Sequence, residues 1–296
     1  MSSEPASAQT TLFERRLVID KKRRQDPESD FLLRHCCELL IDRLTDITVT
    51  FPLAADLGAH VPQDMMPRLV EHGGVEHLFR CGITGENLSV MSDEEMIPFQ
   101  ESLDLIISHL SLHKVNDLPG TLIQIRRALK PNGLFLGCLY GGETLHQLRH
   151  SLQHAELELS GGLHPRVMPF IDKQQAGGLL QRAGFALPVV DSERITVTYP
   201  SLHALMRDLR GMAETNILKV RKKTFDRKAL FQRAEEIYRE EFSDADGRLE
   251  AMFEVIFLIG WAPHDSQQKP MRPGSAKTGL ADALGTKEIG SGEKPI

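Results

Sequence analysis

The residues most able to do chemistry follow segments that the sequence predicts as strands. Asp56 and Gly58 come after a short apolar stretch, acids occupy 93–95, and histidines follow the apolar run 104–112. Parallel sheets bind ligands beyond the carboxyl ends of their strands, so these side chains are candidates for one site. The candidate catalytic residues are His113, Tyr140 and Glu143, and the candidate ligand-binding residues are Asp56, Gly58, His60, Asp93, Glu94 and His109.

Each candidate also has a simpler structural explanation. Histidine titrates near neutral pH, so His113 could be a general base, or it could be a hydrogen-bonded histidine beside a helix N-terminus. Glu143, which follows Tyr140 at the start of a predicted helix, could be a cap alone. Asp93 could be a solvated acid, and His60 could be a neutral filler. The residue types alone leave both interpretations open.

Several familiar motifs are missing. No GxGxxG, GxxxxGK[ST] or GxSxG occurs, which argues against a Rossmann dehydrogenase. His146, His150 and His154 recur at helical spacing, but no further ligands converge on them, so no metal site is predicted. The cysteines have neither zinc spacing nor a disulfide framework and are predicted to be reduced and buried: Cys36, Cys37, Cys81 and Cys138.

The elements that must position these residues alternate between strands and helices from about 50 to 140. This alternation predicts an α/β fold with a parallel sheet and helices on both faces. A helical arm should precede the sheet, and a helical insertion at about 200–245 should lie over the strand ends. The segment 188–199 is predicted as strand material or a hairpin. We expect one domain over 12–264, with disordered ends at 1–11 and 265–296.

The composition is that of an ordinary globular protein. The chain has 296 residues, 41% of them hydrophobic and 26% charged. Its net charge of -6 argues against binding of nucleic acid, and no apolar run is long enough to span a membrane. The first ten residues lack both an apolar core and arginine, so neither a signal peptide nor a mitochondrial presequence is predicted.

A basic cluster lies near the N-terminus, within residues 12–26. Its charges could form a solvated helix face, or they could form a lid or a contact with an acidic partner. The cluster consists of Arg15, Arg16, Lys21, Lys22, Arg23 and Arg24.

Longer segments carry a family resemblance. The segments "TFPLAADLG", "SDEEMIPFQESLDLIISHLSLHKVNDLPG" and "LKPNGLFLGCLYGGETLHQLRHSLQHAE" follow the order of class I methyltransferases that use S-adenosylmethionine. With "GGLHPRVMPF" and "IGWAPHDSQQKPMRPGSA" they resemble one branch, the methyltransferase-like assembly factors of respiratory complex I, over about 12–276. The resemblance implies a Rossmann-like sheet of the seven-stranded type.

The resemblance also implies a cofactor and a partner. Members of this branch are understood to hydroxylate an arginine of a complex I subunit, whereas bacterial relatives are usually labelled methyltransferases. The malonyl-carrier-protein methyltransferase is a more distant relative. In the family, the first strand ends in an acid and a glycine turn, here Asp56 and Gly58. A later acid, here Asp93, lies beside the adenine of S-adenosylmethionine.

The sequence departs from the family at the cofactor motif. The family's D-L-G-C-G-x-G has His60 and Pro62 in place of its second and third glycines. Those glycines let the backbone approach the ligand and allow positive φ. The second strand lacks the acid that holds the ribose, with Glu86 the nearest substitute, and Lys114 replaces a family tryptophan. We therefore expect S-adenosylmethionine to bind weakly or not at all.

Three functions follow as hypotheses. The first is methyl transfer from S-adenosylmethionine to a protein side chain during complex I assembly. The second is hydroxylation of an arginine on a complex I subunit, and the third is a non-catalytic assembly factor that has lost its cofactor. The chain is expected to be an enzyme of the methyltransferase type, in a bacterial cytoplasm or, alternatively, the mitochondrial matrix. Its expected partner is a protein, with no nucleic acid.

Overall fold

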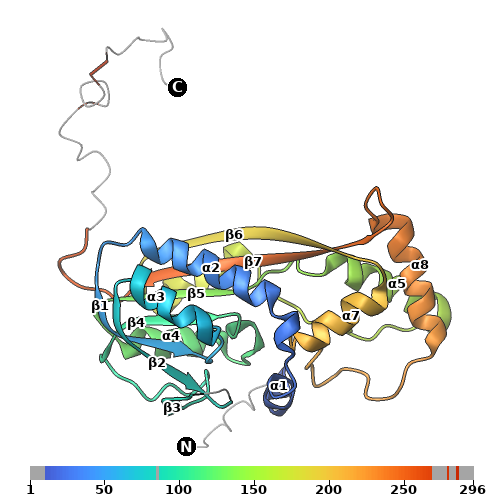
Figure 1. Ribbon diagram of the computed structural model, residues 1–296, viewed down its shortest axis with the longest axis horizontal. Helices are drawn as coiled ribbons and strands as arrows, with labels where there is room; N and C mark the ends of the chain where they lie inside the picture. The colour runs from blue at the N-terminus through green and yellow to red at the C-terminus, as the bar shows by residue number, and fades with distance from the viewer. Residues whose placement is uncertain (1–10, 85–86, 269–278, 280–284, 287–296) are drawn as a thin grey trace, which may run out of the picture. The chain divides into compact units, whose positions relative to one another are not determined.

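A seven-stranded sheet lies at the centre of the fold (Figure 1). The computed structural model describes residues 11–84, 87–268, 279 and 285–286. The strand order is β3-β2-β1-β4-β5-β7-β6. The first five strands in this order, from β3 at the edge to β5, are parallel to one another. Strand β7 is antiparallel to both of its neighbours, β5 and β6. The strands are β1 (Phe51–Leu57), β2 (Val75–Gly82), β3 (Val90–Met91), β4 (Leu103–His109), β5 (Leu129–Tyr140), β6 (Ala186–Tyr199) and β7 (Leu249–Trp261).

Helices cover both faces of this sheet. One apolar core joins the sheet to α2, α3, α5, α7 and α8, and a second core joins its other face to α4 and α6. The short helix α1 contributes no fully buried residue to either core. The helices are α1 (Arg15–Lys22), α2 (Phe31–Thr45), α3 (Met66–His72), α4 (Leu118–Ala128), α5 (His146–Ser160), α6 (Lys173–Ala183), α7 (Leu202–Gly211) and α8 (Lys228–Phe242).

The central strands are apolar on both sides, as the sequence predicts. Along β4, Leu105 and Ile107 enter the first core, while Ile106 between them enters the second. Successive side chains of a strand point to opposite faces, so a strand covered on both faces needs a continuous apolar run. All four cysteines are also buried and free, which confirms their predicted state.

The direction of strand order reverses between β1 and β4. In open α/β sheets such a switch point opens a crevice at the carboxyl ends of the two strands. The residues after β1, β4 and β5 therefore meet near one edge, as expected. Figure 1 shows β6 and β7 extending toward α5, α7 and α8, and α1 lying near the end of α7.

Three details differ from the expected elements. Strand β6 is one long edge strand rather than a hairpin, because it pairs along its length with β7. The sheet continues beyond residue 140 through β6 and β7, and these two strands make it mixed rather than purely parallel. The Pro131-Asn132-Gly133 turn lies within the bounds of β5.

The chain from His264 onward forms a separate unit. Most of this unit, and residues 1–10, lie outside the described residues, so the disorder predicted for them stays a prediction. In the part of the chain that the structure describes, no helix has the length and apolarity to cross a membrane.

Candidate functional site

The turn after β1 is built around a buried carboxylate. Gly58 has φ of +93°, and a Cβ on it would lie 2.9 Å from the side chain of Ser111. The next residue, Ala59, also has positive φ, at 50°. Asp56 is fully buried below this turn and accepts a 3.3 Å hydrogen bond from the Val61 N–H. Such positive φ values suit glycine and strain other residues, which often marks a functional turn.

Arg80 of β2 fills the space where the sequence analysis looked for an acid. Its Nη2 donates to the carbonyls of Ala59 at 2.8 Å and Val61 at 3.0 Å, and its Nε lies 3.4 Å from Asp56 Oδ2. Burial raises the pKa of Asp56 to about 6, although the charges of Arg80 and Lys22 oppose the rise. The carbonyls of the turn after β1 are thus bound by the guanidinium of Arg80. Glu86, the expected substitute acid, lies outside the described residues.

Helix α1 covers the turn from the other side. The Lys22 ammonium donates to the carbonyls of Gly58 and Ala59, the latter at 3.2 Å. Lys21 donates to the carbonyls of Thr215 at 2.9 Å and Asn216 at 2.8 Å. Burial lowers the pKa of Lys22 to about 8. Lys21 and Lys22 of the basic cluster therefore cover the strand ends. The other members Arg16, Arg23 and Arg24 are exposed.

Arg15 binds two candidate ligand-binding acids, Asp93, which the resemblance places beside adenine, and Glu94. Its Nη2 lies 2.6 Å from Asp93 Oδ1 and 2.5 Å from Glu94 Oε2. Its Nη1 donates to the Lys114 carbonyl at 3.2 Å. The side chain of Glu94 is only 8% exposed, so this ion pair is largely shielded from water. The same Glu94 carboxylate lies 3.2 Å from where a Cβ of Gly58 would be.

These contacts do not fit S-adenosylmethionine in the observed arrangement. The glycine turn faces Ser111, Glu94 and the Lys22 ammonium, and Arg80 occupies the end of β2. A cofactor would need the backbone carbonyls and carboxylates that Lys22 and Arg15 already hold. No catalytic step is therefore derived through this cofactor.

His60 and His109 are linked across the same edge. His109 Nδ1 lies 3.2 Å from the His60 carbonyl, so Nδ1 carries the proton and donates. Burial lowers the pKa of His109 to about 4 and lowers that of His60 well below its usual value. Both rings are thus neutral at pH 7. His60 also lines a polar groove of about 560 Å³ together with Arg34 and Asp64.

The clearest acid–base cluster surrounds His113. Its Nε2 lies 3.1 Å from Glu214 Oε2, and the Lys114 ammonium lies 2.7 Å from Glu214 Oε1. Burial lowers the pKa of His113, so its ring is neutral at pH 7 and donates the Nε2 proton to the carboxylate. Nδ1 is then an acceptor, and it is buried without a partner among the described residues. A neutral imidazole oriented by a carboxylate can accept a proton as a general base.

Tyr140 joins this cluster, whereas Glu143 does not. The ring of Tyr140 lies 4.7 Å from the ring of His113, and burial raises the pKa of its hydroxyl well above the usual value. The side chain of Glu143 is exposed, and its backbone N–H donates to Glu254 Oε2 at 3.0 Å. Glu254 of β7, rather than Glu143, is the buried acid at this helix start.

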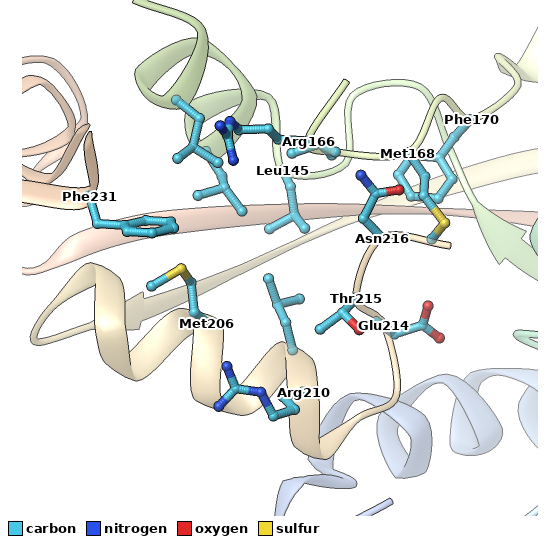
Figure 2. A pocket seen from close by; sticks show the side chains of 14 residues that line it. Leu145, Arg166, Met168, Phe170, Met206, Arg210, Glu214, Thr215, Asn216 and Phe231 are labelled. Carbon is cyan, nitrogen blue, oxygen red and sulfur yellow. The ribbon is translucent and has the colours of Figure 1, made fainter. Parts of the chain in front are cut away.

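An apolar chamber opens beside the cluster (Figure 2). Its volume is about 220 Å³, and Glu214 and Phe170 lie on its wall, where Phe170 also contacts the ring of His113. Leu145, another wall residue, has φ of 54° in the turn after β5. Arg166 at the wall is neutralised by Glu156 and Asp226. Apolar cavities of this size hold small alkyl or aromatic groups.

Two of these participants, Arg80 and Glu214, were not predicted from the sequence, and the partners of Arg15 and Lys22 were not predicted either. Arg80 could have been suspected, because it is a cation at the strand end where the family has an acid. The basic cluster pointed to Arg15 and Lys22, but it did not identify their partners. Glu214 had no local signal, because its partners His113 and Lys114 are about 100 residues away in the chain.

The histidines on α5 do not form a metal site with other ligands. His150 and His154 are stacked with their centroids 4.2 Å apart, and His150 lies 2.9 Å from Glu241. Among the described residues, no group of three or more histidine, cysteine, aspartate or glutamate side chains could hold a metal ion.

Known proteins share both the sequence and the fold. A model described as a methyltransferase domain matches residues 55–188. The arginine-hydroxylase NDUFAF5, mitochondrial, of Danio rerio is 41% identical over 86% of this chain and 82% of its own length. A malonyl-[acyl-carrier protein] O-methyltransferase of Xylella fastidiosa is 36% identical, over 59% of this chain and 57% of its own. The YcgJ protein of Bacillus subtilis shares the fold, with a TM-score of 0.50 and 14% identity over 78% of this chain and 99% of its own.

Proposed function

Because this chain belongs to the family of the arginine-hydroxylase NDUFAF5, we propose that it hydroxylates an arginine side chain of a protein partner. The oxygen atom would come from an external oxidant such as dioxygen, with two electrons and two protons from an external donor to reduce its second oxygen atom to water. The observation that carries the proposal is 41% identity that spans 82% of such a relative. The resemblance seen in the sequence further suggests a subunit of respiratory complex I as the partner, with action during its assembly. The fold of the chain is that of a methyltransferase-like protein.

The geometry of the cradle favours this function over methyl transfer. Methyl transfer would need S-adenosylmethionine beside Gly58, where Lys22, Arg80 and Glu94 already occupy the contacts. The carrier-protein methyltransferase also matches a shorter part of the chain than the arginine hydroxylase does. Methyl transfer remains the second candidate, since the methyltransferase model matches the sheet core.

His113 is the residue that we assign to proton transfer. Its neutral ring donates Nε2–H to Glu214 and leaves Nδ1 as the acceptor. The ring itself lies beside the ring of Tyr140. A neutral imidazole with an acceptor nitrogen can take up a proton from a bound substrate. The apolar chamber would exclude water from the alkyl part of the substrate.

Mass spectrometry of the partner tests the proposal. The candidate complex I subunit is expressed with and without the full chain. The mass of each arginine-containing peptide of the subunit is then measured. We expect a mass increment of one oxygen atom on one arginine. The His113→Ala substitution should lower the rate of modification by about 10²–10⁴-fold. The exposed His154→Ala control should leave that rate unchanged.

The other outcomes separate the alternatives. An increment of one methylene would replace hydroxylation with methyl transfer. No increment on a partner that nevertheless binds the chain would favour a non-catalytic assembly factor.

A further inference from the structure

The acids Asp93 and Glu94 already hold a guanidinium. Arg15 reaches them from α1, with one terminal nitrogen between the two carboxylates at 2.6 and 2.5 Å. The other terminal nitrogen donates to the Lys114 carbonyl at 3.2 Å. Two carboxylates and a carbonyl match the planar, many-donor geometry of a guanidinium better than the compact charge of a lysine. This pocket is thus shaped for an arginine side chain.

The helix that delivers Arg15 has few buried apolar contacts. It has eight residues, none fully buried, and no side chain caps its N-terminus. Its half-buried Leu17 and Val18 pack only on a small satellite cluster that includes Phe13 and Leu218. Helices of this length are marginal alone, and elements with few buried apolar contacts open most readily. Arg15 is therefore held mainly by the polar contacts that a competing guanidinium could replace.

The pocket adjoins the proposed base. Lys114 accepts from Arg15 through its carbonyl and binds Glu214 through its ammonium, and Glu214 binds His113. One residue therefore connects the guanidinium pocket to the acid–base cluster. An arginine held at Asp93 and Glu94 would lie at the same edge of the sheet as Tyr140.

We propose that Asp93, Glu94 and the Lys114 carbonyl form the binding site for the substrate arginine, and that Arg15 fills it as an internal pseudosubstrate. This inference rests on the proposed function for its substrate class. An arginine of the protein partner then displaces Arg15, so the resting protein is closed until its partner arrives. In the closed protein the two acids hold a guanidinium, which keeps them from adenine.

Chemical rescue tests the site without any measurement of activity. The full-length Arg15→Ala protein, whose two acids lose their cation, is titrated with N-acetyl-argininamide while its Tm is followed. We expect the ligand to raise the Tm of Arg15→Ala and to bind it at least about tenfold more tightly than it binds the wild type, because no internal competitor remains. The matched control is Arg16→Ala, which removes an exposed arginine of the same helix and should behave like the wild type.

Two further comparisons define the site. N-acetyl-lysinamide should rescue Arg15→Ala less well than the arginine ligand does, because an ammonium lacks the second terminal nitrogen that donates to the Lys114 carbonyl. Adding Asp93→Asn and Glu94→Gln to Arg15→Ala should abolish the response to the arginine ligand. If Arg15→Ala fails to fold, Arg15→Lys takes its place, since it keeps a cation but loses the second nitrogen that donates to the Lys114 carbonyl. A tighter response than that of the wild type is again expected.

Other results would overturn the inference. Equal affinity of the arginine ligand for the wild type, Arg16→Ala and Arg15→Ala would place the ligand elsewhere, and so would an undiminished response after both acids are neutralised. The arginine ligand could rescue Arg15→Ala while the partner's arginine gains no oxygen. That pair of results would reject the proposed hydroxylation but support the guanidinium site.

Discussion

Glu214 is a buried carboxylate that its neighbours keep ionised. Burial opposes its charge, but Lys114 at 2.7 Å and His113 at 3.1 Å more than compensate and lower its pKa to about 2. Charged pairs inside a protein are costly to break one partner at a time, because the remaining charge stays buried. Glu214 therefore fixes the tautomer of His113 and also holds the loop after α7 against the strand ends.

The substitution Glu214→Gln should destabilise the protein. We expect a loss of about 3–5 kcal/mol at pH 7, measured by urea unfolding, because Lys114 loses its buried partner. A depressed carboxylate pKa gives stability that is present above the usual value of 4.5 and is lost as the pH falls toward 2. The difference between the wild type and the variant should therefore shrink below pH 4.5.

A matched substitution controls for the loss of charge alone. Glu143→Gln removes an exposed carboxylate, and its stability should stay within about 0.5 kcal/mol of the wild type. A Glu214→Gln variant as stable as Glu143→Gln would show that the buried cluster does not contribute as described.

At the level of elements, α1 and the turn after β1 close the cradle together. From the sequence, the expected loss of cofactor binding rested on His60 and Pro62 in the turn and on the missing acid of the second strand. The structure adds Lys22 on the carbonyls of Gly58 and Ala59, and Arg80 on the other side of the same turn. Restoring two glycines would leave both cations in place, so the glycine positions alone do not account for the closed cradle.

Calorimetry with S-adenosylmethionine distinguishes these two causes. We expect no micromolar binding to the wild type or to His60→Gly with Pro62→Gly. Adding Lys22→Ala and Arg15→Ala to that double variant should increase the affinity by at least about tenfold, because the contacts of the turn and the acids are released. Micromolar binding by the double glycine variant alone would show that α1 does not occlude the cradle.

The elements differ in how far the sequence could predict them. The apolar run 104–112 carries its pattern locally, and it overlaps the observed strand β4, Leu103–His109. The path of β6 was ambiguous, because only its pairing with β7 makes it one strand. The docking of α1 could not be derived from its charge, since its partners Asp93 and Glu94 lie about 80 residues away.

Across the whole molecule, strand alternation predicted the α/β class and the family resemblance implied the seven-stranded sheet, whereas the partners within the site were not predicted. The order of segments predicted a methyltransferase-like sheet, and the seven-stranded topology confirms it. The candidate residues after β1, β4 and β5 do gather at one edge, yet their partners come from α1, β2 and the loop after α7. The local sequence does not identify the partner in such long-range ion pairs, because a charged residue can pair with any opposite charge that the fold brings close.

Hydrogen exchange on the full chain tests the central claim most directly. Amide exchange in α1 is compared with and without an arginine peptide from the partner, with α2 as the internal reference. If the substrate arginine replaces Arg15, the amides of α1 should lose protection when the peptide binds while those of α2 keep theirs. Unchanged or greater protection in α1 with the peptide bound would contradict the pseudosubstrate account.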